Sequence, residues 1–392
     1  MKKINFGVIG CASRGRLARL VHQPERGLVL KAAVDIDEES FQEFKTWAEK
    51  VGHKDYYLTK DYHQVLQDAN IQAVFITAPD FLHEEMAVDA LMAGKHVFLE
   101  KPMAITIEGC DRVLEAAKKS GSKLFVGHNM RYMPFVLKMK ELIDNDVIGQ
   151  VQSVWCRHFI NYGGDAYFKD WHSERKYSTG LLLQKGAHDI DVIHWLAGGY
   201  SKKVTAMGRL SVYQNCGRRD ASEKGVATSW SNENWPPLSQ TKLSPIIDVE
   251  DHNMMLMQLD NGVQCSYTQC HYTPDSSRNY TFIGTKGRIE NIDGNGGTFI
   301  NVKTTRNSNF SATPDIVYSL HDTHGGHGGA DPKIVEGFIQ YLLNNVTPNV
   351  SPIDARNSVA AGVCATKSLR GEMGMIEVPP VAKEIQAYFS KK

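Results

Sequence analysis

The sequence predicts an α/β protein in which an amino-terminal doubly wound parallel sheet is followed by a carboxyl-terminal α+β domain with a large, mostly antiparallel open sheet. Three observations lead to this prediction. Short apolar segments alternate with helical patterns through about residue 128. A glycine-rich turn follows the first apolar segment. Beyond about residue 150, apolar and polar residues alternate with a period of two, as in strands covered on one face. We therefore expect one domain at residues 1–128 and a second at residues 129–392.

The first apolar strand, at residues 4–9, leads into a nucleotide-binding pattern. The pattern is the Rossmann fingerprint G-x-G-x-x-G with alanine in place of the second glycine, carried by Gly10, Cys11, Ala12, Ser13, Arg14 and Gly15. The first glycine permits a tight turn, a small second residue lets backbone N–H groups approach a pyrophosphate, and the third lets helix and strand pack closely. A helical pattern follows, with Leu17, Leu20 and Val21 on one side. These features predict a dinucleotide-binding Rossmann domain.

The second strand, at residues 28–34, predicts which dinucleotide is bound. It ends in Asp35, 20 residues after Gly15, where an acid bonds the adenosine ribose. A carboxylate there repels a 2′-phosphate, and Ile36 supplies no positive charge beside it. We expect NAD as the cofactor, with NADP less favoured. Arg14 is the residue that could turn toward a phosphate.

The next two strands end in polar residues. Residues 71–77 form a strand, the turn Ala78-Pro79-Asp80 follows, and a helix then carries Leu82 and Met86 before it stops at Gly94.

The strand at residues 97–99 ends abruptly in Glu100, Lys101 and Pro102. Ligands bind at the carboxyl ends of parallel strands, and a lysine held beside a cationic nicotinamide releases its proton more easily. Lys101 is therefore a candidate acid–base residue, the alternative being a surface lysine before a loop proline. A helix capped by Thr106 and ended by Gly121, and a strand at residues 123–127, complete the domain.

The second domain is expected to begin with a helix near residues 135–145. Strands are predicted at residues 151–157 and 254–259, with hairpin turns at residues 260–262 and 284–287. Residues 214–246, which include Trp230 and Trp235, interrupt this rhythm and form either an ordered lid or a disordered insertion. Helical patterns at residues 332–344 and 354–370 close the chain.

Composition narrows the class of protein. Lys plus Arg equals Asp plus Glu at 44 each, so no net charge favours nucleic acid or an anionic membrane as partner. Seven cysteines without a C-x-x-C pair indicate reduced thiols, and no signal peptide or transmembrane run is evident. We expect a cytoplasmic enzyme with a small-molecule substrate.

Three motifs together resemble the Gfo/Idh/MocA family, named for glucose–fructose oxidoreductase, inositol dehydrogenase and a rhizopine-catabolism protein. They are TAPDFLH at residues 77–83, AGKHVFLEKP at residues 93–102 and GAHDID at residues 186–191, in addition to the fingerprint. The resemblance implies NAD or NADP in the first domain. It also implies a carbohydrate or cyclitol substrate on one side of the open sheet, and usually an oligomer contact, here of a homodimer or homotetramer, on the other.

The resemblance also implies roles for individual residues. Lys101 and His188 would be catalytic. The further cofactor-binding positions would be Thr77, Ala78, Pro79, Asp80, His83, Glu100, Lys101 and Asn129. The substrate-binding positions would be Lys101, Arg131, His158, Trp171, Gln184, Lys185, His188 and His324. Helical spacing supports the choice of His188, because it shares a stripe with Asp191 and Trp195 where a core stripe would be apolar.

One departure from the family pattern bears on the reaction. Polyol dehydrogenases of the family usually place an acid four residues before the histidine, where this chain has Gln184. Glutamine cannot take up a proton. The next residue, Lys185, would bind an anionic substrate group, serve in a modified acid–base role, or simply be a solvated lysine at a helix start.

A histidine-rich segment at residues 321–331 invites a metal assignment, but we expect none. Asp331 and Pro332 fit a helix N-cap and first turn better. The glycines of this segment would let it pass close to ligand, with His324 or His327 touching a sugar hydroxyl.

The leading hypothesis is thus an NAD-dependent oxidoreductase of a sugar, sugar derivative or cyclitol. A second hypothesis is an NAD-dependent glycosidase that oxidises C3 transiently and eliminates the aglycone, with Lys185, His158, Tyr162 or His172 as its additional acids and bases. A third is a non-catalytic nucleotide-sensing regulator.

Overall fold

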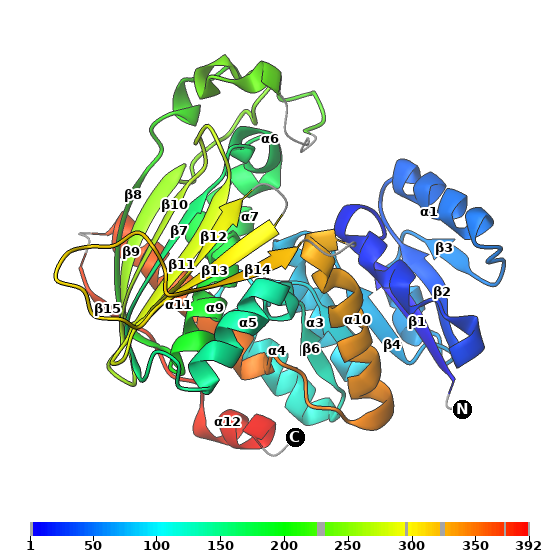
Figure 1. The fold of residues 1–392 in the computed structure, drawn as a ribbon. Coiled ribbons are helices and arrows are strands. Elements are labelled where there is room, and N and C mark those ends of the chain that lie inside the picture. Colours follow the sequence, from blue (N-terminus) through cyan, green and yellow to red (C-terminus); the bar gives the residue numbers. More distant parts are fainter. Residues whose placement is uncertain (1–2, 226–231, 295–296, 322–325, 372–373, 391–392) are drawn as a thin grey trace. The chain divides into compact units, whose positions relative to one another are not determined.

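The computed structural model describes residues 3–225, 232–294, 297–321, 326–371 and 374–390 (Figure 1). The chain forms two compact units. The first unit contains residues 1–132, 325–356 and 381–392, and the second contains residues 133–324 and 357–380. The expected boundary at residue 128 lies close to residue 132, where the chain first passes from the first unit to the second. The expectation did not assign the two later segments, residues 325–356 and 381–392, to the first unit.

A six-stranded parallel sheet forms the centre of the first unit, in the order β3-β2-β1-β4-β5-β6. This is the predicted doubly wound topology, with the chain reversing direction across the sheet between β1 and β4. Its strands are β1 (Ile4–Ile9), β2 (Leu28–Val34), β3 (Tyr57–Thr59), β4 (Ala73–Ile76), β5 (His96–Leu99) and β6 (Leu124–Val126).

Helical elements connect these strands. The α-helices between strands are α1 (Glu38–Lys50), α2 (Tyr62–Gln67), α3 (His83–Met92) and α4 (Ile107–Ser120). The 3-10 helices are η1 (Ser13–Val21), η2 (Pro24–Arg26), η3 (Asp80–Leu82) and η4 (Asn129–Tyr132). The expected ends of α4 are confirmed, because the Thr106 hydroxyl accepts from the Gly109 N–H and Gly121 adopts φ 70°.

Two late helices complete the first unit. They are α10 (Gly326–Asn344) and α12 (Lys383–Ser390), while α11 (Pro352–Arg370) contributes residues to both units. Phe338 of α10 packs against phenylalanines of four neighbouring strands, with ring centres 5.4 to 6.4 Å apart: Phe6, Phe75, Phe98 and Phe125. Helix α10 therefore covers one face of the sheet and shields its core from water.

Two details differ from the expectations for the first unit. The element after the fingerprint is a 3-10 helix, on which Leu17 and Val21 are buried but Leu20 is 39% exposed. A 3-10 helix turns every three residues rather than every 3.6, so the apolar stripe expected for an α-helix does not stay on one side. The Asp331 carboxylate bonds side chains rather than capping α10, as described below.

The second unit is built on a nine-stranded sheet in the order β14-β13-β12-β11-β7-β10-β9-β8-β15. Only β7 and β10 run parallel among its neighbouring strands in the described residues. This confirms the predicted mostly antiparallel sheet. Its strands are β7 (Val151–Phe159), β8 (Ser201–Arg209), β9 (His252–Leu259), β10 (Gln264–Cys270), β11 (Ser277–Gly284), β12 (Arg288–Gly294), β13 (Gly297–Lys303), β14 (Ile316–His321) and β15 (Ile376–Glu377).

Helices of this unit cover the inner face of the sheet, with α9 against β7 and β10 and α5 against β13. The α-helices are α5 (Pro134–Asp144), α6 (Gly163–Tyr167), α7 (Arg175–Ser178), α8 (Leu181–Gln184) and α9 (Gly186–Ala197). The 3-10 helices are η5 (Trp171–Ser173), η6 (Tyr213–Asn215), η7 (Asn232–Asn234) and η8 (Pro237–Ser239).

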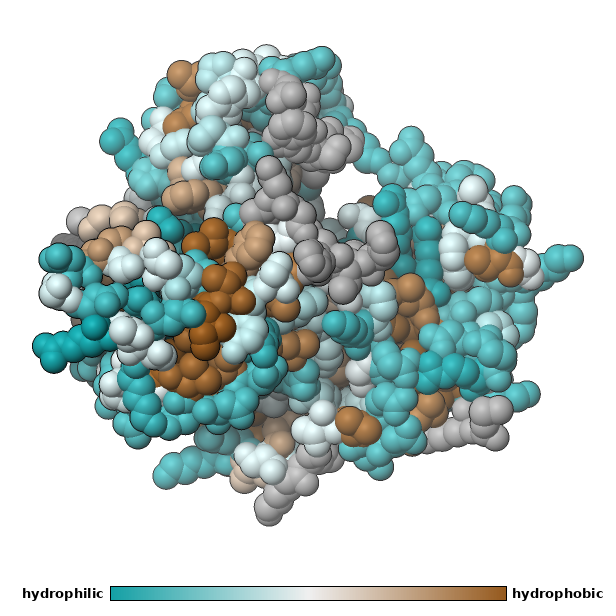
Figure 2. All heavy atoms as spheres, viewed as in Figure 1, coloured by the Kyte–Doolittle hydropathy of each residue, from teal (hydrophilic) through white to brown (hydrophobic). Residues whose placement is uncertain are grey.

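The outer face of the sheet carries exposed apolar side chains. Strand alternation places Met254 and Leu256 of β9 outward beside Met207 of β8, and Trp155 lies on the same face of β7. Figure 2 shows hydrophobic residues gathered over this sheet. A contiguous apolar patch of this kind marks a contact surface.

The segment at residues 214–246 is an ordered insertion where the structure describes it. Cys216 and Leu243 are buried with Tyr213 in a cluster that also contains Tyr167 and Phe168. Trp230 lies outside the described residues, so the lid interpretation stays a prediction. None of the helices in the described part of the chain is long and apolar enough to cross a membrane.

Candidate active site

The fingerprint turn has the geometry of a cradle for a dinucleotide. Gly10 adopts φ 86° and its N–H bonds the Val34 carbonyl at 2.9 Å. A side-chain carbon at Gly15 would lie 1.9 Å from the Gly10 carbonyl oxygen, so no larger residue fits there. The Thr77 hydroxyl donates to the same oxygen at 2.7 Å and ties the turn to the end of β4. Neither Gly10 nor Gly15 can thus be replaced by a larger residue without displacing the turn.

Asp35 lies beside this turn at the end of β2. Its carboxylate accepts the Cys11 N–H at 3.0 Å and the Ile36 N–H at 2.9 Å. These bonds fix the carboxylate beside the turn, where the Rossmann fingerprint predicts the ribose of the nucleotide. Ile36 is 84% exposed and brings no cation.

Arg14 is held by two carboxylates rather than facing solvent. Its Nε lies 2.5 Å from Glu100 and its Nη1 lies 2.8 Å from Asp331, which also contacts His327 at 3.1 Å. Its third nitrogen, Nη2, is buried and has no partner among the described residues. The turn, the ribose-side acid and this unpaired donor fit a bound NAD, with Arg14 restrained from turning to a 2′-phosphate.

Glu100 and His83 position the strand end that carries Lys101. One Glu100 oxygen bonds Arg14, and the other accepts the Lys101 N–H at 3.0 Å. The buried His83 ring contacts the Pro102 carbonyl at 2.7 Å and the Ala78 carbonyl at 2.8 Å. The TAPDFLH and EKP motifs therefore meet through hydrogen bonds. Lys101 itself is half-buried.

The other predicted positions of the first unit lie around this edge. Pro79 precedes η3, and Asp80 is buried at its start. Asn129 and Arg131 lie in η4 and are buried. Arg131 donates to the Asn349 carbonyl at 2.7 Å and pairs with Asp354 at 3.2 Å, so its guanidinium holds a later segment of the same unit.

In the second unit, the predicted residues Gln184, Lys185 and His188 lie at the junction of α8 and α9. Gln184 ends α8 and is buried, Lys185 precedes α9 and is half-buried, and His188 lies in the first turn of α9 with 8% exposure.

Directly after His188, the Asp189 carboxylate organises the inner face of the sheet. It is fully buried and contacts His158 Nδ1 at 2.9 Å, Arg278 Nε at 3.0 Å and the Tyr267 hydroxyl at 2.8 Å. The Tyr280 hydroxyl donates to it as well. Although burial opposes its charge, Arg278 and His158 hold the pKa of Asp189 well below its usual range.

Sheet register explains how these residues meet. His158 of β7 pairs with Gln269 of β10 on one side and with Arg278 of β11 on the other. Burial, followed by the positive charge of Arg278, lowers the pKa of His158 to about 3. The imidazole is therefore neutral at physiological pH and serves to orient its neighbours.

The sequence-based predictions include His158 and His188 but not Asp189, Arg278 or the two tyrosines that the structure groups with them. Asp189 had a signal in the sequence, since it is an acid that directly follows His188 on a largely apolar helix. Arg278 and Tyr280 had none, because they reach the site only through pairing of β11 with β7.

Two further predicted positions are Trp171 and His324, together with His327 of the same histidine-rich segment. Trp171 stacks on His172 in η5, with ring centres 3.7 Å apart. His324 lies outside the described residues, whereas His327 is exposed beside Asp331. Among the described residues, no three His, Cys, Asp or Glu side chains are grouped to hold a metal ion.

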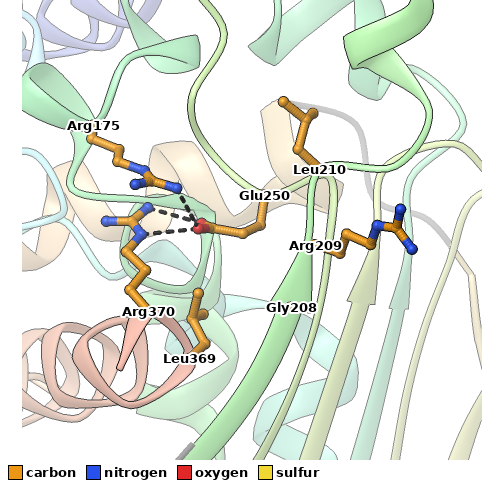
Figure 3. Close-up of a pocket in the computed structure, with 7 residues that line it drawn as sticks. All are labelled: Arg175, Gly208, Arg209, Leu210, Glu250, Leu369 and Arg370. Atoms are coloured by element: carbon orange, nitrogen blue, oxygen red, sulfur yellow. Dashed lines mark hydrogen bonds and ion pairs between the residues drawn. The ribbon is translucent and has the colours of Figure 1, made fainter. Parts of the chain in front are cut away.

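A separate pocket of about 260 Å³ lies between β8 and the end of α11 (Figure 3). Arg175 and Arg370 both point at Glu250, and Arg370 bonds its two oxygens at 2.9 and 2.8 Å. Arg209 points away from them (Figure 3). The two partly exposed arginines and the buried Glu250 form an ion-pair cluster that joins α7 and α11 to the β8–β9 connection.

A Rossmann unit with a nucleotide cradle and a strand-end lysine defines a nicotinamide-dependent oxidoreductase. Two family models match the chain: "Oxidoreductase family, NAD-binding Rossmann fold" over residues 4–128 and "Oxidoreductase family, C-terminal alpha/beta domain" over residues 140–378. The chain belongs to the Gfo/Idh/MocA oxidoreductase family.

Curated relatives share this family. YteT of Bacillus subtilis (strain 168), named as an oxidoreductase, is 28% identical over 77% of this chain and 80% of its own length. Inositol 2-dehydrogenase of Salmonella typhimurium is 34% identical over 51% of this chain, and the match spans about half (55%) of that relative.

Solved structures share the fold of the whole chain. Levoglucosan dehydrogenase in complex with NADH and levoglucosan has a TM-score of 0.77 at 19% identity, covering 96% of this chain and 100% of its own. GenD2 from gentamicin A biosynthesis, in complex with NAD, has a TM-score of 0.72 at 20% identity, with 97% of each chain covered.

Proposed function

We propose that this enzyme is an NAD-dependent dehydrogenase that transfers a hydride between a sugar, sugar derivative or cyclitol and the nicotinamide. The observation that carries the proposal is the joining of Lys101 to the nucleotide cradle. Glu100 bonds both the Arg14 side chain and the Lys101 backbone, so the same carboxylate sets the turn and the strand end.

The residues have separable tasks in this proposal. Bound NAD would supply the hydride acceptor. Lys101 would contact the reacting hydroxyl and take up its proton, because an amine at the edge of the nucleotide site can exchange protons with a positioned oxygen. His188 would orient the same hydroxyl and stabilise developing negative charge on its oxygen. Gln184 would provide hydrogen bonds without proton transfer.

The substrate class rests on the relatives. Inositol 2-dehydrogenases are among the curated relatives, and a levoglucosan dehydrogenase is among the structures that share the fold. These names support a polyhydroxylated ring as substrate here.

A screen of sugars, cyclitols and chromogenic glycosides with NAD tests this proposal. We expect NADH to form from a free sugar or cyclitol. Release of an aglycone without NADH accumulation would instead indicate the transient-oxidation glycosidase. NAD binding without turnover of any compound would indicate the nucleotide-sensing regulator.

We further propose that copies of the chain associate as a homodimer or homotetramer through the outer face of the nine-stranded sheet. Its exposed Trp155, Met207, Met254 and Leu256 would be covered in such a contact. A cytoplasmic location is also proposed. It is supported by the cysteines, all seven of which lie in the described residues as free thiols.

A further inference from the structure

Lys185 lies in a cluster of hydrogen-bonding groups that contains no acid partner for it. Its ammonium is 5.9 Å from the ring centre of Tyr162 and 5.4 Å from that of Tyr167. The two rings are themselves 6.3 Å apart. No carboxylate of a described residue forms an ion pair with Lys185. Two phenols thus lie around one positive charge that no carboxylate of a described residue compensates.

The nearby acid cannot neutralise this charge. The Asp189 carboxylate is already bonded to His158, Arg278 and two tyrosine hydroxyls. The positive charge of Arg278 is balanced by this same carboxylate, which therefore has no charge left to compensate Lys185. A buried or half-buried cation without a counter-charge is costly, so this arrangement favours an anion supplied from outside the chain.

A buried histidine next to the cluster also lacks a partner. His271, which follows β10, is fully buried and stands edge-on to the Tyr167 ring at 5.4 Å. Both of its ring nitrogens are without a hydrogen-bond partner among the described residues. Burial, followed by electrostatic repulsion from His158 and Lys185, lowers the pKa of His271 well below its usual value. The ring is therefore a neutral polar group beside the lysine.

The electrostatics at Tyr162 agree with this geometry, whereas burial raises the pKa of Tyr167. The positive charge of Lys185 lowers the pKa of Tyr162 against the opposing effect of burial, with a further contribution from Arg278. Negative charge on an oxygen at this point of the molecule is therefore stabilised. Although burial opposes its charge, the two phenols raise the pKa of Lys185, which is protonated at neutral pH.

Buried residues packed around Tyr162 and Tyr167 hold the two phenols in place. Tyr167 belongs to a buried apolar cluster that includes Tyr213 and, from the insertion at residues 214–246, Leu243. Tyr162 packs against this cluster. The Tyr213 hydroxyl accepts the Gly164 N–H at 3.0 Å and donates to the His271 carbonyl at 2.7 Å. Because the donors are held in place before a ligand arrives, ligand binding costs little ordering entropy.

We propose that Lys185, with the hydroxyls of Tyr162 and Tyr167, binds an anionic oxygen group of the substrate, so that the substrate is an acidic sugar. This inference rests on the proposed dehydrogenase function and specifies its substrate class. The anionic group is the carboxylate of a uronic acid or the phosphate of a sugar ester. Lys185 directly follows Gln184, which is neutral and does not repel such a group.

The test compares matched neutral and anionic sugars. Glucose, galactose and mannose are assayed beside their hexuronates and their 6-phosphates, by NADH formation and by calorimetric binding to the NADH-loaded enzyme. We expect an anionic member to exceed its neutral counterpart by about tenfold or more in kcat/KM, mainly through KM, as for loss of a hydrogen bond to a charged group. The hexuronate and phosphate arms identify which anion is bound.

Variants then assign the preference to Lys185. Lys185→Met should lower kcat/KM for the anionic sugar about tenfold more than for its neutral counterpart, mainly through KM, whereas Lys185→Arg should retain most of the preference. The exposed Lys202→Met serves as a charge-matched control in the same unit and should behave like wild type.

The outcomes of these assays distinguish failure of the anion-binding inference from failure of the proposed dehydrogenase function. Equal turnover of neutral and anionic sugars by the wild type would overturn the inference but not the proposed function. A Lys185→Met variant that loses kcat equally on both, with a shifted pH profile, would mean that Lys185 serves proton transfer and would also overturn it. Failure of every sugar in the panel and in the earlier screen to reduce NAD would contradict the proposed function itself.

Discussion

At the scale of single residues, Glu100 links the two halves of the nucleotide site. It is 5% exposed, and its two oxygens bond the Arg14 side chain and the Lys101 backbone. Gly127 of the neighbouring strand allows this, because a side-chain carbon there would lie 3.1 Å from the Glu100 carboxyl carbon. Glu100 of the EKP motif thus holds the backbone of Lys101 in position, which is a structural role.

Replacement of Lys101 tests the strand-end lysine directly. Lys101→Met should leave NAD binding and the thermal transition nearly unchanged but lower kcat by about a hundredfold or more, the usual scale for loss of a positioned acid–base group. Turnover is measured on the best sugar of the screen, NADH binding by nicotinamide fluorescence, and NAD binding by protein fluorescence. The exposed Lys119→Met, at the end of α4, is the matched control. Near-normal turnover in Lys101→Met would make the lysine structural.

Cofactor choice depends on Asp35. Wild type should bind NAD at least about tenfold more tightly than NADP, because the carboxylate repels a 2′-phosphate and Arg14 is held by Glu100 and Asp331. Asp35→Asn removes the charge while keeping an acceptor oxygen, and it should narrow the difference. Fluorescence titration of both nucleotides measures this. Equal or tighter binding of NADP by the wild type would show that Asp35 does not face the ribose.

At the scale of elements, local patterns predicted the first unit better than the second. The parallel strands, the caps of α4 and the EKP strand end are properties of short segments, and each was evident in the sequence. The inner-face row of β10, β7 and β11 is not local, since it brings together Gln269, His158 and Arg278 through strand pairing. Period-two alternation predicts which side of a strand is buried, but not which strand lies next to it.

Two buried histidines, His158 of this row and the nearby His271, predict that the stability of the protein depends on pH. His158 and His271 are buried and neutral, with the pKa of His158 lowered to about 3 by burial and then by Arg278. Histidines of the unfolded chain take up protons below about pH 6.5. The stabilisation is therefore complete above about pH 6.5 and declines as the pH falls toward the lowered native pKa.

Thermal unfolding at pH 7.5 and 5.5 measures this effect. Wild type should lose several degrees of Tm on acidification, and His271→Asn should lose less, because it removes one of the buried neutral imidazoles. The exposed His63→Asn should retain the full wild-type dependence. An identical pH dependence in wild type and His271→Asn would show that this imidazole does not contribute.

At the scale of the whole molecule, the chain forms two units that are discontinuous in sequence. Residues 325–356 and 381–392 belong to the first unit, where Phe338 completes the core on one face of the parallel sheet. The helical pattern at residues 332–344 was evident, but amphipathic spacing does not indicate which sheet a helix covers. This is why a single boundary at residue 128 was expected.

Association of copies is the prediction that belongs to this scale. Light scattering should give the mass of a dimer or tetramer for the wild type, and Leu256→Lys should shift it toward the monomer, since a charge is placed in a buried apolar contact. Leu256 is 59% exposed in the single chain. Leu238→Lys, at an equally exposed leucine outside the sheet, is the control. A monomeric wild type, or an unchanged mass in Leu256→Lys, would contradict the proposed interface.

The central claim, net hydride transfer to NAD, is tested most directly by stoichiometry. The sugar or cyclitol with the highest turnover in the screen is incubated with excess NAD in deuterated water, and NADH, oxidised product and deuterium at the carbon next to the reacting one are counted together. The proposed dehydrogenase predicts one NADH for each product molecule and no deuterium at that carbon. Product formation with no NADH accumulated and with deuterium incorporated would contradict the claim, because the hydride would then have returned to the substrate.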